Sequence, residues 1–383
     1  MYISIKGVGF VNKGAELMLY AAMQKIKERL PKVNLVLDVS SESPYKSRMA
    51  LGAYQKFSIS KLGINMDRTG YFIPDSIKER LTQKWGLVTE SDIDVLLDAS
   101  GFAYGEQWSD TGVMETAANE LKRFKDAGKK YIFLPQAFGP FLQTTQTAKF
   151  GAAVKHATLV MARDRQSYQY LESLLQGDCD NLVQYPDFTN LLHEVDSSRN
   201  ILELDQVLII PNSKMLSKRN RDQQWCETYV EILQNLISII LIKNLRPVVL
   251  NHEGLEDETL CRLLMDKVGN RLEFLKVEKV MDICQIIGNS RLVISSRYHG
   301  CITALSQGVP CIGTSWSHKY ENLFSEYEVP DLLLSPNECR ESLLFKIEVA
   351  LKSELRDRLV HVSNKMKDRT IQMWEAVFAK IAT

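Results

Sequence analysis

Residues 94–134 decide the fold class of this chain of 383 residues. They begin with a short apolar run, DVLLD at 94–98, continue through a helical pattern over 113–127, and end in a second apolar run, YIFL at 131–134. Neither run alternates with polar residues, which is typical of strands buried on both faces of a parallel sheet. Strand, helix and strand in this order form a βαβ unit, so the stretch predicts an α/β fold.

The same alternation of strands and helices runs along most of the chain. It includes apolar runs at 158–161, 207–210, 247–250, 291–294 and 310–312, and helical patterns at 145–156 and 223–243. The polar stretch 194–200 is the best candidate for a linker. We therefore expect two doubly wound Rossmann-like domains facing a cleft, over residues 1–195 and 200–350. Residues 351–383 have apolar positions near helical spacing and predict a terminal helix, which could pack back on the first domain.

Composition excludes several classes of protein. Hydrophobic residues make up 45% and charged residues 25%, which argues against disorder. Lys plus Arg and Asp plus Glu both number 47, so no chain-wide basic field for a nucleic acid is expected. The most apolar run, 232–242, is too short for a membrane span and predicts a buried helix.

The N-terminus and the cysteines favour a cytoplasmic protein. The first six residues, MYISIK, lack the basic region and long apolar stretch of a signal peptide and predict a first strand. The seven cysteines are scattered and include no C-x-x-C pair, so we expect free thiols and no zinc site.

Residues 44–90 follow no regular pattern, and residues 46–84 are basic. Eight Lys or Arg residues and three acidic ones give this segment a net charge of +5, and aromatic residues are interleaved with them. One interpretation is a solvated insertion with its own small core. The other is a surface for an anionic or lipid-linked substrate at the membrane.

Glycine-rich or small-residue loops follow the predicted strands of the first domain. The first has the spacing G-x-G-x-x-x-x-G at 7–14 and leads into a helix, a geometry that lets backbone amides approach an anion. The next loops, DASGFAYG at 98–105 and PQAFGPF at 135–141, lie at carboxyl ends of strands, where ligands of open α/β sheets bind. The alternative is that each loop is only a tight turn. The candidate contacts in these loops are Gly9, Asn12, Gly14, Glu16, Ser100, Gly101 and Gln136.

The strongest local feature lies in the second domain. The strand at 292–294 is followed by Ser296-Arg297-Tyr298-His299 and an apolar helix, and a further strand precedes Lys319. An arginine at a helix start concentrates positive potential on a carboxylate or phosphate, and a histidine can exchange a proton near neutral pH. In the first domain, Arg163 has a similar place after the strand at 158–161, although a surface ion pair would explain it equally well.

These blocks together resemble the polysaccharide pyruvyl transferase family. The resemblance rests on Ser296-Arg297-Tyr298-His299, Gly308-Val309-Pro310, Lys319, the glycine-rich start at 7–14, PQAFGP at 135–140, Arg163-Asp164-x-x-Ser167 and Pro186-Asp187. It extends over residues 1 to 325. It implies a fold similar to that of B-type glycosyltransferases and transfer of pyruvate from phosphoenolpyruvate to a sugar, as a ketal across two hydroxyls.

The resemblance implies roles for single residues. Arg163, Arg297 and Lys319 would bind phosphoenolpyruvate, and His299 would protonate its methylene, activate the sugar hydroxyl or contact the phosphate. We expect no metal and no further cofactor, since no His, Cys or carboxylate cluster has metal-ligand spacing. The expected setting is a bacterial surface-polysaccharide pathway, with a soluble or lipid-linked acceptor and the enzyme in the cytoplasm or peripheral at the inner face of the membrane.

Two departures concern the acceptor. Ala15 stands where the family often has an acidic residue, with Glu16 next to it, and Ser100-Gly101 stands where the family has a glycine pair.

The main alternative function is a nucleotide-sugar-dependent glycosyltransferase of the same architecture, for which only Glu321 and Glu326 are available as acidic ribose contacts. A non-catalytic sugar-binding protein is the other alternative, and the set of cations argues against it.

Overall fold

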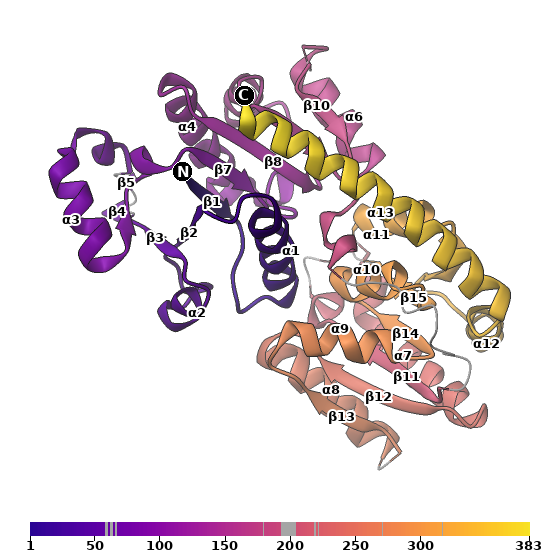
Figure 1. Ribbon diagram of the computed structural model, residues 1–383. Helices are drawn as coiled ribbons and strands as arrows, with labels where there is room; N and C mark the ends of the chain where they lie inside the picture. The colour runs from indigo at the N-terminus through magenta and orange to yellow at the C-terminus, as the bar shows by residue number, and fades with distance from the viewer. Residues whose placement is uncertain are drawn as a thin grey trace. The chain divides into compact units, whose positions relative to one another are not determined.

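The computed structural model describes residues 1–57, 60–61, 64–65, 67–178, 180–192, 204–217, 220, 222–269, 271–315 and 317–383. The chain forms two compact units (Figure 1). Unit 1 comprises Met1–Thr189 with Arg369–Thr383, and unit 2 comprises Asn190–Asp368. The linker predicted at 194–200 lies outside the described residues.

Unit 1 is built on an eight-stranded sheet in the order β10-β9-β8-β7-β1-β2-β3-β6, in which all neighbouring strands pair in parallel. The strands are β1 (Tyr2–Lys6), β2 (Asn34–Asp38), β3 (Tyr54–Lys56), β6 (Leu87–Val88), β7 (Val95–Asp98), β8 (Lys130–Gln136), β9 (Leu159–Ala162) and β10 (Leu182–Gln184), beside a separate hairpin of β4 (Ser60–Lys61) and β5 (Ile64–Asn65). The helices are α1 (Lys13–Arg29), α2 (Tyr45–Ala50), α3 (Asp75–Trp85), α4 (Val113–Asp126), α5 (Thr145–Val154) and α6 (Arg165–Leu175), with 3₁₀ turns at Asp67–Phe72, Glu90–Asp92, Glu106–Thr111 and Phe188–Leu191.

Unit 2 is built on a six-stranded parallel sheet in the order β13-β12-β11-β14-β15-β16. Its strands are β11 (Gln206–Ile210), β12 (Arg246–Asn251), β13 (Glu273–Lys276), β14 (Leu292–Ser295), β15 (Cys311–Thr314) and β16 (Leu333–Leu334). Its helices are α7 (Gln224–Ile242), α8 (Gly254–Val268), α9 (Val280–Gly288), α10 (Tyr298–Ser306), α11 (His318–Glu326), α12 (Arg340–Ala350) and the first part of α13 (Ser353–Ala382), with 3₁₀ turns at Ser213–Leu216 and Pro330–Leu332.

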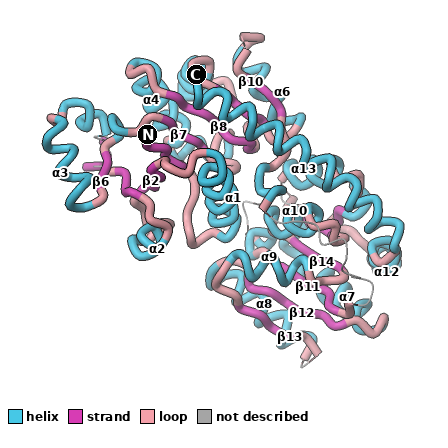
Figure 2. The backbone as a smooth tube through the Cα atoms, in the orientation of Figure 1, coloured by secondary structure: helices cyan, strands magenta, loops and turns pink. Residues whose placement is uncertain are grey.

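The prediction of two doubly wound parallel sheets is confirmed. Figure 2 shows the strands of each sheet flanked by helices. The apolar runs form the central strands because all four residues of β7, and all four of β14, are buried. In both sheets the first strand lies in the middle, and the following strands are added on one side of it before the other side is built. The point where the direction reverses is the switch point of the sheet. It lies between β1 and β7 in unit 1 and between β11 and β14 in unit 2. The carboxyl ends of strands at such a point form the crevice that binds ligands in this class of fold.

The end of the chain belongs to unit 1. Within Arg369–Thr383, the Trp374 ring packs edge-on against Phe188, with the ring centroids 6.1 Å apart. The Nζ of Lys130 donates to the carbonyl of Lys380 at 2.7 Å. Helix α13 therefore starts in unit 2 and contributes its last turns to the core of unit 1.

Helix α7 is long and apolar enough to cross a membrane by length and composition alone, with a mean hydropathy of 1.3. Its buried side chains, among them Ile232, Leu236 and Ile240, belong to the core of unit 2. This agrees with the prediction of a buried helix at 232–242.

The prediction that residues 44–90 are irregular is wrong. They contain α2 and α3, and β3 and β6 extend the main sheet of unit 1. Strands of three and two residues are too short to show a hydrophobic period, so the sequence pattern missed them. The basic charge of this segment is also partly internal, because Arg48 and Lys56 are buried. These two residues therefore cannot contribute to a cationic surface.

Candidate functional site

The glycine-rich loop after β1 packs on the loop after β7, at the switch point of unit 1. Gly7 has φ +78°, and a Cβ on it would come within 2.4 Å of the Cα of Ser100. Only glycine tolerates both this conformation and this approach. Gly9 also lies close to another loop, since a Cβ on it would come within 2.8 Å of the carbonyl oxygen of Glu42. The glycines thus let three loops meet at the carboxyl edge of the sheet.

Helix α1 begins at this edge, and the predicted contacts at its start are already engaged. The Oδ1 of Asn12 caps the helix by accepting from the amides of Gly14 and Ala15, at 2.8 and 3.2 Å. Glu16 is buried, and its carboxylate pairs with the Nζ of Lys13 at 2.8 Å. The helix start is therefore fixed by its own side chains.

The loops after β7 and β8 meet around Asp98. The Oδ1 of Asp98 accepts from the backbone N and the Oγ of Ser100, at 3.1 and 2.7 Å. Gln136, fully buried at the end of β8, donates its Nε2 to the carbonyl of Asp98 at 3.2 Å. The Oε1 of Gln136 has no hydrogen-bond partner in the described part of the chain. A buried oxygen without a partner is costly, so a ligand donor at this oxygen would be stabilising.

Gly101, the last predicted contact of this group, shapes the same loop. It has φ +71°, and a Cβ on it would meet the Cε of Met18 from α1 at 3.1 Å. The structure thus gathers the seven predicted contacts of unit 1 around the carboxyl ends of β1, β7 and β8.

Arg163, predicted to bind the donor, is buried in unit 1. Its Nη1 donates to Oδ2 of Asp187 at 3.0 Å. The Oδ1 of Asp187 also accepts from the backbone N and Oγ1 of Thr189, at 3.0 and 2.6 Å. The ion pair thus joins the end of β9 to the turn after β10. Asp164, the next residue, caps α6 by accepting from the amide of Ser167 at 2.8 Å.

A buried cluster of charges, which the sequence analysis did not identify, lies near the same sheet edge. The carboxylate of Glu120 on α4 accepts from the Nζ of Lys6 at 2.7 Å and the Nζ of Lys56 at 2.8 Å. Lys6 also lies 3.7 Å from Asp98, and Lys56 lies 3.7 Å from Asp67. Lys6 is the last residue of β1 and Lys56 is the last residue of β3. Their position at strand ends is the sequence signal that could have identified them as candidates.

Mutual charge compensation stabilises this cluster. Burial alone would raise the pKa of Glu120, but Lys6 and Lys56 hold it well below its usual range. Burial would likewise lower the pKa of Lys6 and of Lys56, but nearby carboxylates, Glu120 first among them, raise both above the ordinary lysine value. All three groups are therefore charged over the physiological range, and we assign the cluster to the stability of unit 1.

Hydrogen bonds organise the switch point of unit 2. The Nδ2 of Asn212, just after β11, donates to the carbonyl of Ser296, just after β14, at 3.0 Å. That carbonyl also accepts from the phenol of Tyr320 on α11 at 2.9 Å. The hydroxyls of Ser296 and Tyr229 lie 2.5 Å apart. The segment Ser296-Arg297-Tyr298-His299 therefore leaves the sheet in a fixed path.

Arg297 is held by two carboxylates from the neighbouring strand–helix connection. Its Nε and Nη2 donate to Oδ2 of Asp257 at 2.8 and 2.5 Å, and its Nη1 donates to Glu253. Asp257 is fully buried and also accepts from the amide of Ser213 at 2.9 Å. Arg297 is thus oriented by Asp257, while the Glu253 contact is the more exposed of the two.

His299 and Lys319 lie next to aromatic rings at the starts of α10 and α11. His299 stands in the first turn of α10, with its ring 5.5 Å from that of Tyr298. The Nζ of Lys319 lies 5.3 Å from the ring centroid of Tyr298 and 5.6 Å from that of Tyr320. Both rings therefore hold the lysine ammonium by cation–π attraction.

Two further side chains at this edge have buried oxygens that suit a ligand. The Oδ1 of Asn251, at the end of β12, and the Oγ of Ser317, just before α11, are buried and have no hydrogen-bond partner among the described residues. Their neighbours His252 and His318 are buried as well. None of these four was predicted. Ser317 and His318 could have been identified because they lie beside Lys319 in the sequence. Asn251 and His252 lie at the carboxyl end of β12, where ligands bind in this class of fold, so recognition of β12 would have identified them.

The residues of unit 2 that were predicted to bind the donor are positively charged groups at helix starts. Arg297 supplies a planar cation, Lys319 a second cation, and the amino ends of two nine-residue helices supply amides and positive dipole ends. In the described part of the chain, no group of three or more His, Cys, Asp or Glu side chains is placed to hold a metal ion.

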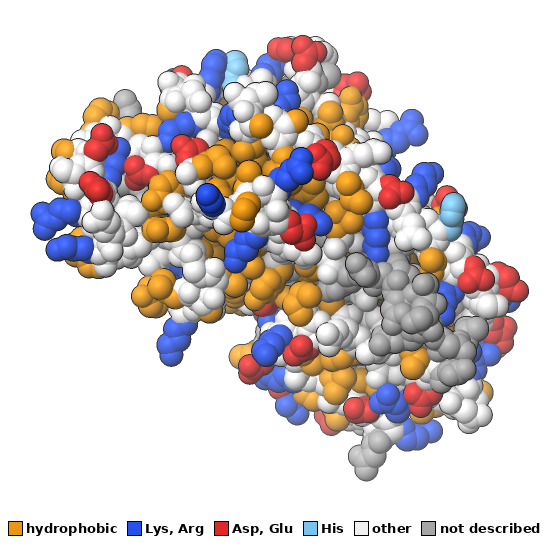
Figure 3. All heavy atoms as spheres, in the orientation of Figure 1, with side chains coloured by type: hydrophobic (Ala, Val, Ile, Leu, Met, Phe, Trp, Pro, Cys, Tyr) orange, Lys and Arg blue, Asp and Glu red, His pale blue; other side chains and the backbone are white. Residues whose placement is uncertain are grey.

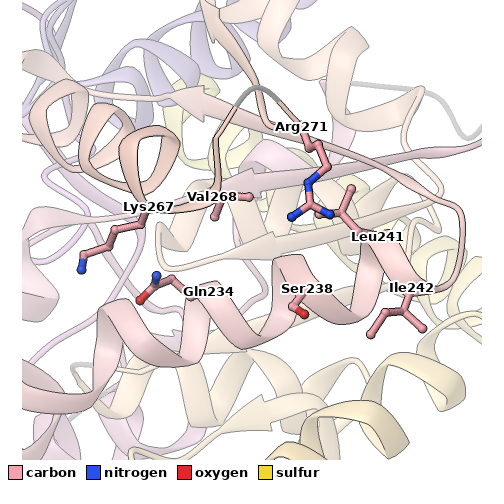
Figure 4. Close-up of a pocket in the computed structure, with 7 residues that line it drawn as sticks. All are labelled: Gln234, Ser238, Leu241, Ile242, Lys267, Val268 and Arg271. Atoms are coloured by element: carbon pink, nitrogen blue, oxygen red, sulfur yellow. The ribbon is translucent and has the colours of Figure 1, made fainter.

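The pocket shown in Figure 4 lies at the opposite edge of this sheet. It has a volume of about 290 Å³ and is lined by the ends of α7 and α8, with Lys267 and Arg271 near its rim. Because these are the carboxyl ends of both helices, their partial negative charge is compensated by the two cations. This pocket therefore lies away from the strand carboxyl ends, where ligands bind in this class of fold.

Comparisons with known structures agree with the two-sheet fold. The chain is similar in structure to HepE of Anabaena in complex with UDP and glucose, at 12% identity and a TM-score of 0.58, over 100% of this chain and 99% of that one. It is also similar to UDP-GlcNAc 2-epimerase of Neisseria meningitidis bound to UDP-GlcNAc, at 9% identity and a TM-score of 0.59, over the full length of both chains. The glycosyltransferase WaaG, involved in lipopolysaccharide biosynthesis, matches at 13% identity and a TM-score of 0.53, over 98% of this chain and 99% of that one.

At these identities the likeness shows the fold alone, the two-sheet architecture of B-type glycosyltransferases. No curated protein sequence matches the chain significantly. The family model described as polysaccharide pyruvyl transferase matches residues 12–318, which include the predicted contacts from Asn12 to His299. The chain therefore belongs to the polysaccharide pyruvyl transferase family.

Proposed function

We propose that this protein transfers pyruvate from phosphoenolpyruvate to a sugar of a surface polysaccharide or its precursor, forming a pyruvate ketal. Family membership supports the class of reaction. The observation that carries the assignment of the donor is the carboxyl edge of β14, where Arg297, His299 and the start of α10 meet at the switch point of the second sheet. We assign the predicted contacts of unit 1 to the acceptor.

The donor is a small, highly charged anion, and three features would bind it. Arg297, kept in place by Asp257, presents its guanidinium to the donor, and exchange of the Glu253 contact for a donor oxygen would free Nη1 for this role. Lys319 adds a second cation, and Ser317 offers its buried hydroxyl. Arg163, paired with Asp187 in unit 1, is better suited to anchoring the end of β9 than to binding the donor.

The reaction needs one protonation and two carbon–oxygen bonds. His299 donates a proton to the methylene carbon of phosphoenolpyruvate, which becomes a methyl group, and the adjacent carbon becomes electrophilic. A sugar hydroxyl bonds to that carbon, and the bond to the phosphate oxygen breaks. The second hydroxyl then closes the ketal. The two hydroxyl protons balance the one given by His299 and the one taken by the departing phosphate.

We further propose a peripheral membrane contact at α3, which would suit a lipid-linked acceptor in the cytoplasm. Around this helix three large apolar side chains are exposed, Phe72 by 75%, Trp85 by 58% and Ile77 by 49%. Arg80 and Lys84 are exposed on the same helix, as are Asp75 and Glu79, and Figure 3 shows basic, acidic and hydrophobic side chains at the margin of unit 1 where α3 lies. Apolar and cationic groups together are typical of a helix at the membrane interface.

The decisive experiment is incubation of the purified protein with phosphoenolpyruvate and a mixture of glycans. Release of inorganic phosphate, together with a mass gain of one pyruvyl group on a glycan, is expected. Phosphate release without glycan modification would contradict the proposal. Glycan extension with UDP-sugars, and none with phosphoenolpyruvate, would instead favour a nucleotide-sugar-dependent glycosyltransferase.

A further inference from the structure

A groove in unit 1 lies beyond the loops assigned to the acceptor. Its volume is about 750 Å³, within the range of about 300 to 1,000 Å³ common for ligand sites. It is formed by the end of the PQAFGPF loop, the first turn of α5 and the second half of α6. Among the residues that line it are Phe141, Gln143, Thr144, Thr147, Tyr170 and Ser173.

The lining has the chemistry of a site for a neutral sugar. It contains no Asp, Glu, Lys, Arg or His, which is unusual on a chain with 25% charged residues. Two aromatic rings, Phe141 and Tyr170, offer flat apolar faces, and hydroxyl and amide side chains stand beside them. A sugar ring presents the same combination of apolar C–H faces and neutral hydroxyls, whereas an anionic ligand would find no counter-charge here.

The polar groups of the groove are available to a ligand. The side chains of Gln143, Thr145 and Ser173 are exposed or at the rim and have no hydrogen-bond partner within the described part of the chain. The hydroxyls of Thr144 and Thr147 lie 2.9 Å apart, and the former also accepts from the amide of Thr147 at 3.1 Å. The hydroxyls of Thr144 and Thr147 are therefore held in place, whereas the other three side chains can turn toward a ligand.

The wall of the groove is rigid because its loop is tied to its neighbours. The amide of Phe138 donates to the Oγ of Ser167 at 3.0 Å, and the amide of Gly139 donates to the carbonyl of Tyr104 at 2.8 Å. Gly139 has φ +75°, and a Cβ on it would meet the Tyr170 ring at 2.6 Å. The ring therefore lies directly on the backbone of the loop, so the binding surface needs little ordering when a ligand arrives.

We infer that this groove binds neutral sugar residues of the acceptor chain, apart from the sugar that receives pyruvate. The loop that begins at Gln136, one of the predicted acceptor contacts, ends at Phe141 in the groove. One rigid loop therefore joins a predicted acceptor contact to the groove. The choice of an acceptor sugar as ligand rests on the proposed function, but the chemical class follows from the lining alone.

The test separates binding from catalysis. An array of neutral and anionic oligosaccharides is probed with the full-length protein in the absence of phosphoenolpyruvate, and the best ligand is titrated by calorimetry. Ser173→Trp fills the groove from an exposed position, and Gln169→Trp places the same side chain on the same helix outside the lining. We expect a neutral oligosaccharide to bind, with at least tenfold loss for Ser173→Trp and wild-type affinity for Gln169→Trp.

A milder variant tests the polar contacts. Gln143→Ala should weaken binding about 2- to 10-fold, the effect of one neutral hydrogen bond. Thermal melting of each variant should match that of the wild type. Binding of anionic oligosaccharides only, binding of none, or equal affinity of Ser173→Trp and Gln169→Trp would overturn the inference. Loss of binding in Ser173→Trp without any pyruvyl transfer by the wild type would refute the proposed function and leave the groove as a sugar site.

Discussion

The guanidinium of Arg297 and the carboxylate of Asp257 form a doubly hydrogen-bonded buried ion pair, with Nε and Nη2 at 2.8 and 2.5 Å from one oxygen. Asp257 is fully buried, whereas Arg297 reaches the carboxyl edge of β14. Asp257 therefore anchors the pair, and Arg297 lies at the edge where we propose that the donor binds. This relationship changes what substitution of Arg297 would do.

Arg297→Ala should abolish turnover and also destabilise unit 2, because it leaves the Asp257 carboxylate buried without its cation. Breaking a buried pair in this way costs about 3 to 5 kcal/mol. Chemical unfolding and phosphate release would be measured on the same protein. Arg262→Ala is the control, since it removes an exposed ion pair on α8 and should cost less than about 1 kcal/mol.

Glu253→Gln separates binding from stability at the same site. It removes the more exposed contact of Arg297 and keeps the Asp257 pair. Stability should hardly change, and the KM for phosphoenolpyruvate should fall. An unchanged KM in Glu253→Gln, together with normal turnover in Arg297→Ala, would exclude Arg297 from the donor site.

His299→Gln should keep the fold and lose most of the rate. General acids typically contribute about 10² to 10⁴-fold, and the variant cannot donate a proton to the methylene carbon. His361→Gln is the control, since His361 is an exposed histidine on α13. Wild-type activity with an unchanged melting temperature in His299→Gln would make His299 a structural residue.

Glu120→Gln should destabilise unit 1 at neutral pH by about 3 to 5 kcal/mol, because it leaves the buried Lys56 and the partly buried Lys6 without their shared carboxylate. The pKa of Glu120 is depressed in the folded protein. Its contribution is therefore complete above the ordinary glutamate value of about 4.3 and disappears as the pH falls toward the folded value.

The raised pKa values of Lys6 and Lys56 give the stability of unit 1 the opposite dependence on pH. Their contribution is complete below the ordinary lysine value of about 10.4 and is lost as the pH rises through the folded values. Hydrogen exchange of β1 and β3 amides, measured from pH 4 to 9, should show loss of protection in Glu120→Gln. The exposed Glu115→Gln on the same helix should match the wild type. Equal protection in both variants would show that the cluster contributes little.

Addition of EDTA should leave pyruvyl transfer intact. The charge of phosphoenolpyruvate can be met by Arg297, Lys319 and the amino ends of α10 and α11. Phosphate release would be followed with and without the chelator. Loss of activity that magnesium or manganese restores would contradict this prediction and would favour a donor bound through its diphosphate, as in the alternative glycosyltransferase.

The fold could be predicted from the sequence because its central strands are continuous apolar runs. β7 and β14 each consist of four buried residues, and their following loops are marked by small or charged residues. The edge strands β3 and β6 could not be predicted, because so few residues show no period.

The candidate residues could be located by the same rule of strand ends, but their partners could not. Asp257 lies 40 positions from Arg297, and Glu120 lies 114 positions from Lys6. Neither separation in sequence matches the period of a helix or a strand. Only the tertiary fold therefore brings these charges together. The groove beside Phe141 was missed for the same reason, since two helices and a loop form it jointly.

The last prediction concerns the membrane contact at α3. The double variant Ile77→Ser/Trp85→Ser should bind vesicles of phosphatidylserine and phosphatidylcholine less tightly, because two exposed apolar side chains no longer enter the interface. Arg80→Glu/Lys84→Glu should weaken binding further, since each basic residue near an anionic surface contributes about 1 kcal/mol. Binding of the wild type should decrease as salt rises, because screening shortens the reach of these charges to about 8 Å at physiological ionic strength.

The matched controls for the α3 variants are Ile371→Ser, at an equally exposed isoleucine of unit 1, and Lys122→Glu on α4. Both should bind vesicles like the wild type. Transfer to a lipid-linked acceptor should fall in the α3 variants, and transfer to a soluble sugar should not. If vesicles bind the α3 variants as tightly as the controls, or bind no form of the protein at any salt concentration, α3 is an ordinary solvated helix.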